Sequence, residues 1–182
     1  LKCADFACGS GAFLLELYQL IYDSLVDWYV MNDKSRLIQT GVNSYKLPYS
    51  IKRDILTKCI YGVDKDYNAV EACKFGLLLK LLEDEDVNTL SASHPVLPDL
   101  NRNIFYGNSL LSPQNVPAEL VEKINPFDFG NLKFDLIVGN PPYMKTEDIK
   151  HFTPEEKKLY EKNHLYKSAH KQYDKYLLFI ER

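Results

Sequence analysis

The stretch LKCADFACGSGAFLLEL, residues 1–17, decides the fold, because an apolar strand pattern passes through a glycine-containing loop into a helical pattern. Leu1–Phe6 predicts a strand, and apolar residues then recur at helical spacing from Gly11 to about Met31. A strand, a short loop and a helix in this order begin a βαβ unit. The sequence therefore predicts an α/β protein.

The same alternation recurs along the chain. Further strands are predicted at Cys59–Asp64, Asn103–Gly107 and Phe134–Gly139, the last one buried. The other predicted segments are a loop at 32–49, a helix Ile51–Lys58 capped by Ser50, a helix capped by Asp66 or Asn68 and running to about Leu82, a surface connection at 83–102, a short helix Pro117–Ile124, a capping box at Thr153–Glu156 and an amphipathic helix Tyr173–Arg182. Four strands that alternate with helices indicate a parallel sheet with right-handed crossovers.

Composition is that of an ordinary globular domain. The 182 residues carry a net charge of −3, with 46% hydrophobic and 26% charged residues. The charge is uneven, because residues 144–182 hold nine Lys and Arg against seven Asp and Glu. Lysines and tyrosines interleave between 145 and 176, which suits either a DNA-lining surface or a solvated helical face. This segment is the part of the chain better suited to phosphate.

Several classes of function lack a sequence signal. Cys3, Cys8, Cys59 and Cys73 have no metal-ligand spacing, so we expect free thiols. The apolar stretches are too short to span a membrane, so we expect a cytoplasmic protein with no membrane partner. Nuclease-like acidic pairs occur only as loose matches far apart in the sequence, so we predict no nuclease site in this chain.

The motif Asn140-Pro141-Pro142-Tyr143 carries the strongest functional signal. It follows a predicted strand, at the sheet edge where ligands bind in open α/β folds. The Asn140 side-chain oxygen and the Pro141 carbonyl can accept both hydrogens of an amino group, and Tyr143 offers a face for stacking. The alternatives are an Asx-turn before proline for Asn140 and a core aromatic role for Tyr143. We expect a clamp for a planar group that carries an NH₂.

The loop after the first strand suits a cationic cofactor. Glycines at 9 and 11 let the backbone turn and approach a ligand, but Leu14 stands where a dinucleotide site has its third glycine. Asp64, 53 residues beyond Gly11, can bind a ribose diol, or alternatively cap the following helix. Because the Asp5 carboxylate would repel a pyrophosphate, S-adenosylmethionine fits better than NAD.

Together these motifs resemble the N6-adenine-specific DNA methyltransferases of the type IIG restriction-modification family, in which a restriction enzyme and a methylase are fused. The similar segments are Asp5–Leu14, Gly62–Asp66, Gly107–Leu110 and Asn140–Tyr143, in the family's order. The stretch from Tyr173 to Arg182 also resembles the family's next helix. Three departures are Phe6 in place of a common proline, Asn108 in place of a frequent acid, and Lys65 in place of an apolar residue.

The resemblance implies a Rossmann-like, S-adenosylmethionine-dependent methyltransferase fold, of which this chain holds about four strands of a partial parallel sheet with flanking helices. It implies methylation of the N6 amino group of a flipped-out adenine in double-stranded DNA. The implied catalytic residues are Asn140, Pro141, Pro142 and Tyr143. The implied cofactor-binding residues are Asp5, Ala7, Gly9, Gly11, Asp64, Lys65, Asn108, Ser109 and Asn140.

On this reading residues 1–182 are the N-terminal part of a catalytic domain, and the remaining strands and the target-recognition domain lie elsewhere. A restriction nuclease is then an expected fused or associated partner, and the resemblance implies a protein of the cytoplasm of a bacterium or archaeon. We expect this stretch alone to transfer little or no methyl group. The nearest alternative is a methyltransferase that acts on a protein glutamine amide or a ribosomal RNA base, and a non-catalytic binding fragment is a further one.

Overall fold

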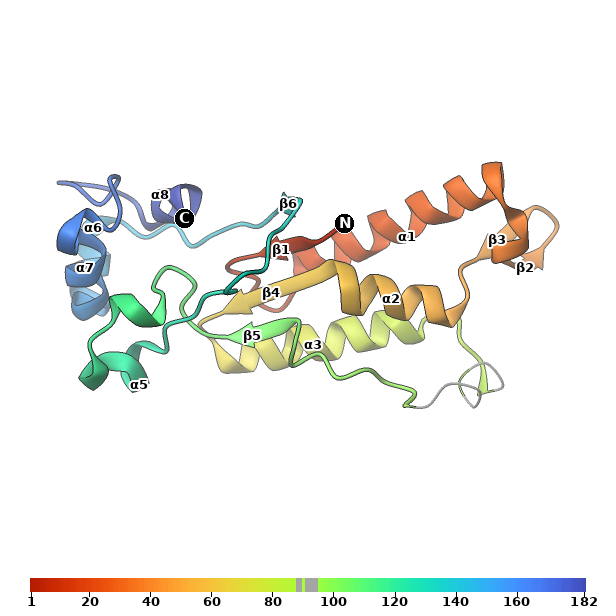
Figure 1. Cartoon of the computed structure of the whole chain (residues 1–182), viewed down its shortest axis with the longest axis horizontal. Helices are drawn as coiled ribbons and strands as arrows, with labels where there is room; N and C mark the ends of the chain where they lie inside the picture. The colour runs from red at the N-terminus through yellow and green to blue at the C-terminus, as the bar shows by residue number, and fades with distance from the viewer. Residues whose placement is uncertain (88–89, 91–94) are drawn as a thin grey trace.

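The computed structural model describes residues 1–87, 90 and 95–182, and there the predicted α/β fold with a parallel sheet is confirmed (Figure 1). The strands of the sheet are β1 (Cys3–Asp5), β4 (Ile60–Asp64), β5 (Ile104–Tyr106) and β6 (Leu136–Ile137). Their spatial order is β5-β4-β1-β6, and every pairing is parallel. The chain runs outward from β1 to β5 and then returns to the other side of β1. Ligands of open α/β sheets bind at such a reversal, outside the carboxyl ends of the strands.

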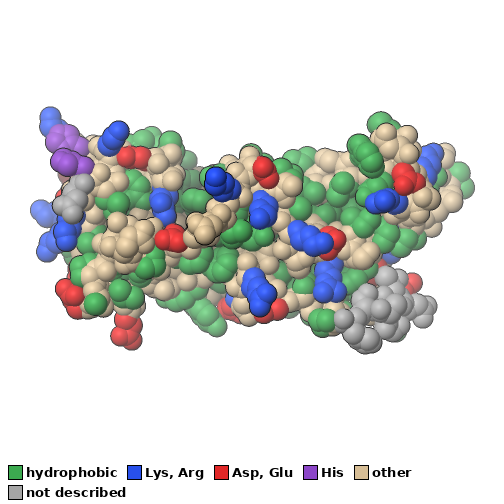
Figure 2. Space-filling model, viewed as in Figure 1, with side chains coloured by type: hydrophobic (Ala, Val, Ile, Leu, Met, Phe, Trp, Pro, Cys, Tyr) green, Lys and Arg blue, Asp and Glu red, His purple; other side chains and the backbone are tan. Residues whose placement is uncertain are grey.

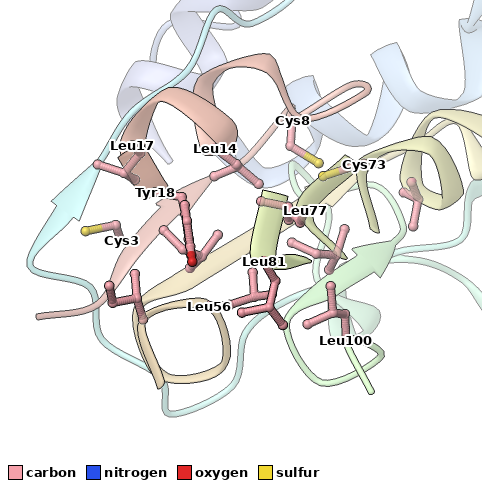
Figure 3. Packing of buried hydrophobic residues seen from close by; sticks show 14 of the residues in the cluster. Cys3, Cys8, Leu14, Leu17, Tyr18, Leu56, Cys73, Leu77, Leu81 and Leu100 are labelled. Carbon is pink, nitrogen blue, oxygen red and sulfur yellow. The ribbon is translucent and has the colours of Figure 1, made fainter. Parts of the chain in front are cut away.

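One face of the sheet packs against three helices, α1 (Ala12–Asn32), α2 (Tyr49–Cys59) and α3 (Tyr67–Leu82). The buried residues of this core include Cys3, Leu14, Tyr18, Leu56, Ile60, Cys73, Leu77 and Ile104 (Figure 3). Glycine is required where α1 crosses β4, because a Cβ on Gly62 would lie 2.7 Å from Leu14 Cδ1. The close approach of helix and strand fixes the loop between β1 and α1 over the sheet edge.

The opposite face of the sheet carries aromatic side chains. Tyr61 and Phe105 alternate with the residues that face the helices. They meet rings of the loop before β6, with centroids 5.5 Å apart for Tyr61 and Phe134 and 4.8 Å apart for Phe105 and Phe127. This loop therefore packs on the sheet before the chain enters β6.

A second packing unit lies beyond the carboxyl ends of the strands, where the β4 and β5 arrows point in Figure 1. We call residues 110–125 and 144–182 the cap, and the rest of the described chain the sheet region. The cap contains α5 (Val121–Ile124), α6 (Thr146–Phe152), α7 (Pro154–Glu161) and α8 (Lys175–Glu181). Its core buries Leu110, Leu111, Ile149, Leu159, Tyr160, Tyr166, Tyr173 and Leu178.

The remaining elements are short: 3-10 turns η1 (Lys34–Arg36), η2 (Pro113–Asn115), η3 (Ala118–Leu120) and η4 (Lys162–His164), and strands β2 (Ile38–Gly41) and β3 (Ser44–Lys46). Among the described residues, no helix has the length and apolar character that a membrane span needs. The predicted connection at 83–102 falls partly outside the described residues.

Two predictions for residues 32–58 are wrong. The predicted loop contains the β2–β3 hairpin, whose turn places Asn43 at a φ of 61°. β2 is exposed along its length and β3 is at most half-buried, so the sequence shows no alternation that would predict them. Ser50 is not an N-cap, because α2 begins at Tyr49 and the carbonyl of Pro48 accepts the N–H of Ile51 at 3.0 Å.

The fourth strand and the capping box are also corrected. β6 has two residues, and Leu136 and Ile137 are 42% and 58% exposed rather than buried, because in the described chain β1 is their only neighbouring strand. Thr153 precedes α7, but its hydroxyl donates to the carbonyl of Ile149 at 3.2 Å. Glu156 turns into the protein instead of reaching back to the cap.

Candidate functional site

A groove runs along the carboxyl edge of the sheet, between the sheet region and the cap. Its first half is a cavity of about 280 Å³. The residues that line it are Phe6, Ala7, Asp64, Lys65, Gly107, Asn108, Ser109, Asn140, Pro142, Lys175 and Phe179. The fold thus brings six of the predicted cofactor-binding residues to one place, with Asn140 of the clamp among them, and adds Pro142 of the clamp.

The second half of the groove, about 290 Å³, shares Phe6, Ala7 and Phe179 with the first. Asp5, Gly139 and Pro141 also line it. The residues after β6 therefore alternate between the two halves: Asn140 and Pro142 line the first, and Gly139 and Pro141 line the second. This alternation places the predicted amino clamp on the wall that the two halves share.

Asp5 is a buried carboxyl group at the end of β1. It is 2% exposed and accepts a hydrogen bond from the Ala7 N–H at 2.9 Å. The pKa of Asp5 is raised to about 6, mainly by burial and in part by the Asp64 charge, against the lowering effect of the Ala7 hydrogen bond. Gly139 has a φ of 154°, and a Cβ there would lie 2.5 Å from Asp5 Oδ1. Only glycine lets the chain after β6 pass this carboxyl group.

The glycine loop is shaped by its own packing and by Asp64. Gly11 precedes α1 with a φ of 90°, and a Cβ on it would lie 2.5 Å from the Cys73 Sγ. The Gly9 N–H donates to Asp64 Oδ2 at 2.8 Å. Gly9 and Gly11 therefore set the path of the loop rather than line the groove. Ala7 is the loop residue that lines both halves.

Asp64 is not the N-cap of α3. Asp66 caps that helix by accepting the N–H groups of Asn68 and Ala69 at 2.8 and 3.3 Å. The two Asp64 oxygens instead accept Gly9 N–H and Asp66 N–H, the latter at 2.9 Å. A carboxylate has about four acceptor positions, so Asp64 keeps capacity for a ligand that lies in the groove.

Asn108 and Ser109 follow β5 and are almost fully buried, at 2% and 6% exposure. Asn108 Oδ1 accepts the Leu110 N–H at 3.1 Å, whereas its Nδ2 is buried without a hydrogen-bond partner among the described residues. Ser109 Oγ donates to the Phe6 carbonyl at 2.6 Å. The Asn108 side chain also interacts with the buried Tyr160 hydroxyl, and Asn108 is one of the residues that line the first half of the groove.

The predicted clamp is open to solvent on its outer side. Tyr143 is 73% exposed and its ring lies 5.6 Å from that of Tyr176, so the alternative of a core aromatic is wrong. The Asn140 side chain is exposed and forms none of the hydrogen bonds found in the described chain, an Asx-turn bond included. Both side chains are therefore available to a ligand.

The wall contributed by the cap contains charged residues that no sequence signal predicts. Glu156, 6% exposed, pairs with Lys65, with Lys175 at 3.2 Å and with the Tyr160 hydroxyl at 2.7 Å. Burial opposes ionisation of Glu156, but the Lys175 and Lys65 charges hold its pKa below the ordinary value. Burial lowers the pKa of Lys175, against the attraction of Glu156. Lys65 is thus ion-paired at the edge of the groove.

The lysines and tyrosines of 145–176 separate in the fold. Tyr160, Tyr166 and Tyr173 belong to the core of the cap, which removes them from any surface that lines DNA. Lysine and histidine side chains gather at the outer end of the cap (Figure 2). The exposed ones are Lys145, Lys150, His151, Lys158, Lys162, His164, Lys167, His170 and Lys171.

The cysteines agree with the expectation of free thiols. In the described part of the chain, no cluster of three or more His, Cys, Asp or Glu residues could hold a metal ion.

Comparison with known proteins identifies the family. The model of the Eco57I restriction-modification methylase matches residues 58–182. The whole chain is 57% identical to the type II restriction enzyme and methyltransferase RM.Eco57I of Escherichia coli, of which it covers 18%. Over 112 residues, 61% of the chain, it is 32% identical to RM.MjaORFECS2P of Methanocaldococcus jannaschii, a protein whose name includes the same two activities, and it covers 9% of that protein. The chain therefore belongs to the Eco57I restriction-modification methylase family.

Proposed function

We propose that this chain provides the cofactor pocket and the amino clamp of a DNA methyltransferase that uses S-adenosylmethionine. Its target is the exocyclic N6 amino group of an adenine flipped out of double-stranded DNA. The observation that carries the proposal is that Asn140 and Asp64 line one cavity, with Asp5 in the adjoining half of the same groove.

The groove fits this cofactor better than a dinucleotide. Asp64 has acceptor capacity for the ribose hydroxyls, and Asn108 and Ser109 line the same cavity, where the adenine of the cofactor would lie. The buried Asp5 carboxyl would repel a pyrophosphate, whereas the ammonium and sulfonium groups of S-adenosylmethionine would favour its charged form. When bound, the cofactor supplies a methyl group on a positively charged sulfur, and this sulfur is a good leaving group because it leaves as a neutral thioether.

The Asn140–Tyr143 clamp supplies alignment rather than a strong base. The lone pair of an adenine amino group is delocalised into the ring, so the nitrogen is a weak nucleophile. Asn140 Oδ1 and the Pro141 carbonyl can accept its two N–H bonds, which turns the lone pair out of the ring plane. Prolines lack an N–H and restrict the backbone, so their carbonyls stay directed at the substrate. Holding two reactants in line provides a large part of the rate in such reactions.

Tyr143 provides the aromatic ring on which the flipped base would stack. An enzyme cannot reach this amino group inside a duplex, so the base has to leave the helix. Stacking on an aromatic ring contributes about 1–3 kcal/mol per base, which offsets part of the unpairing cost. The exposed Tyr143 ring, supported by Tyr176, is suited to this contact.

DNA is the proposed substrate class because the two curated relatives are named as restriction enzymes and methyltransferases. A restriction enzyme recognises DNA, so a methylase fused to one would act on the same polymer. We propose a fused or associated nuclease and a target-recognition domain as partners on the same grounds.

The test is transfer of a radiolabelled methyl group by the intact protein to DNA, to ribosomal RNA and to a protein with a glutamine substrate, each in a separate reaction. We expect label in DNA, as N6-methyladenine. Asn140→Ala should reduce this transfer at least 100-fold, because it removes one of the two acceptors that align the amino group. Asn131→Ala, an exposed change in the loop before β6, is the matched control. Label in RNA or protein but not in DNA contradicts the proposal.

A further inference from the structure

The chain that leaves the clamp is bound to the start of α8. The Met144 N–H donates to Asp174 Oδ1 at 3.0 Å, and the Lys175 N–H donates to the Met144 carbonyl at 2.8 Å. Both backbone polar groups of the residue after Tyr143 are thus held by two adjacent residues. The exit of the clamp cannot shift without breaking contacts to α8.

Contacts of two further residue pairs extend this attachment. Thr146 Oγ1 donates to the Tyr173 carbonyl at 2.7 Å and accepts the Tyr173 N–H at 2.6 Å. On the other side of Met144, the rings of Tyr143 and Tyr176 lie 5.6 Å apart. We call this set of contacts between residues 143–146 and 173–176 the brace.

Asp174 is the residue whose side chain joins the brace to the helix start. The same Oδ1 that accepts Met144 N–H also accepts the Tyr176 N–H at 3.2 Å, which makes Asp174 the N-cap of α8. One carboxylate therefore fixes both the beginning of the helix and the exit of the clamp. Asp174 lines a separate cavity rather than either half of the groove, so it acts through the loop and not on a ligand.

The brace also leads to the cofactor half of the groove. Lys175, the next residue, turns inward to Glu156, and Glu156 pairs with Lys65 directly after Asp64. The start of α8 thus contacts the clamp through Asp174 and the ribose-side wall through Lys175. A rotation of α8 would move the two walls of the groove relative to each other.

We propose that Asp174 is a positioning residue, which sets the orientation of Asn140–Tyr143 against the cofactor side of the groove. The inference rests on the proposed function and adds to it a residue that touches neither substrate nor cofactor. Since a displacement of about 1 Å can cost about 100-fold in rate, we expect Asp174 to affect turnover more than binding.

The test uses Asp174→Ala, Asp174→Asn and the control Asp148→Ala in the intact protein. Asp148 is an exposed acid of α6. Hydrogen–deuterium exchange at the Met144 amide is the first readout. Asp174→Ala should speed this exchange about 10-fold or more, because a lost acceptor worth about 1.5 kcal/mol corresponds to that factor. Asp174→Asn should keep most of the protection, because its amide oxygen still accepts, and Asp148→Ala should match the wild type.

Steady-state methyl transfer is the second readout. We expect Asp174→Ala to lower kcat about 10- to 100-fold, with the KM for S-adenosylmethionine within about threefold of the wild type. Asp174→Asn should recover most of kcat. Unchanged exchange in Asp174→Ala overturns the inference, and so does faster exchange with an unchanged kcat. An intact wild-type protein that methylates no DNA overturns the proposed function instead, because the exchange comparison does not depend on catalysis.

Discussion

The sheet region and the cap place their buried ion pairs differently, although both border the same groove. Both cores bury tyrosines, and the sheet region pairs Lys52 with Glu85 at 2.7 Å, away from the residues that line the groove. In the cap, Lys175 lines the groove and pairs with the buried Glu156. Buried charges need defined partners. We therefore expect the larger apolar core of the sheet region to provide most of the stability, and the ion cluster of the cap to fix the orientation of the groove's second wall.

The largest effect should come from the core of the sheet region. Leu77→Ala removes a fully buried side chain from the contact between α3 and its neighbours and should lower the free energy of unfolding by about 3–5 kcal/mol. Urea denaturation measures the loss. Leu79→Ala on the exposed side of α3, where the side chain is 51% exposed, should change it by less than about 0.5 kcal/mol. Equal losses for the two variants would mean that the predicted core is wrong.

The cap should respond to the loss of a charge. Glu156→Ala leaves Lys175 buried without its partner, and we expect a loss of about 3 kcal/mol. Because the pKa of Glu156 is lowered in the folded protein, its stabilising effect is present above about pH 4.5 and is lost as the pH falls through the folded pKa. The difference between wild type and variant, measured by denaturation, should therefore shrink below pH 4.5. Lys158→Ala, an exposed change on the same helix, should leave the midpoint unchanged.

Asp5 should destabilise the sheet region at neutral pH. The pKa of Asp5 is about 6 in the folded protein, above the ordinary 3.8. The contribution of Asp5 to the free energy of unfolding is therefore most favourable below about pH 4, and it is lost as the pH rises through 6. Asp5→Asn should therefore stabilise the protein by about 3 kcal/mol at pH 8 and by little at pH 4. Asp135→Asn, a change at an exposed acid, is the matched control. A stability gain that is the same at both pH values would contradict the assignment of the shift to Asp5.

The smallest predicted effect concerns ligand binding. If Asp5 faces the cationic groups of S-adenosylmethionine, affinity should fall about 10-fold between pH 7.5 and pH 5, as Asp5 takes up a proton. Isothermal titration calorimetry of the intact protein measures this change. Asp5→Asn should bind weakly and with little dependence on pH. The same pH dependence in both proteins would place the cation elsewhere.

The two regions also differ in how far the sequence predicts them. Strands β1, β4 and β5 and helices α1 and α3 are predicted to within about two residues, because their apolar periodicity reflects burial in one core. β6 is predicted too long and buried, since a sequence pattern does not show that a strand lies at a sheet edge. The cap has short helices joined by turns, which carry weak periodicity.

The residues that line the groove differ in the same way: most of those of the sheet region are predicted from the sequence, and those of the cap are not. The residues predicted on the sheet side meet in one place, because the carboxyl ends of parallel strands share an edge. Lys175, Phe179 and Glu156 are not predicted for the site, since their contribution depends on how the cap folds over that edge. Glu156 is instead predicted for a capping box. The local sequence does not distinguish a glutamate that caps a helix at the surface from one that is buried in an ion cluster.

The most direct test of the account is a crystal structure of the intact protein with bound S-adenosylmethionine. We expect the ribose hydroxyls within hydrogen-bond distance of Asp64, the adenine beside Asn108, and the sulfonium methyl directed toward Asn140. A cofactor bound outside the groove between the sheet region and the cap, or with its methyl directed away from Asn140, would contradict the assignment of this groove as the catalytic site.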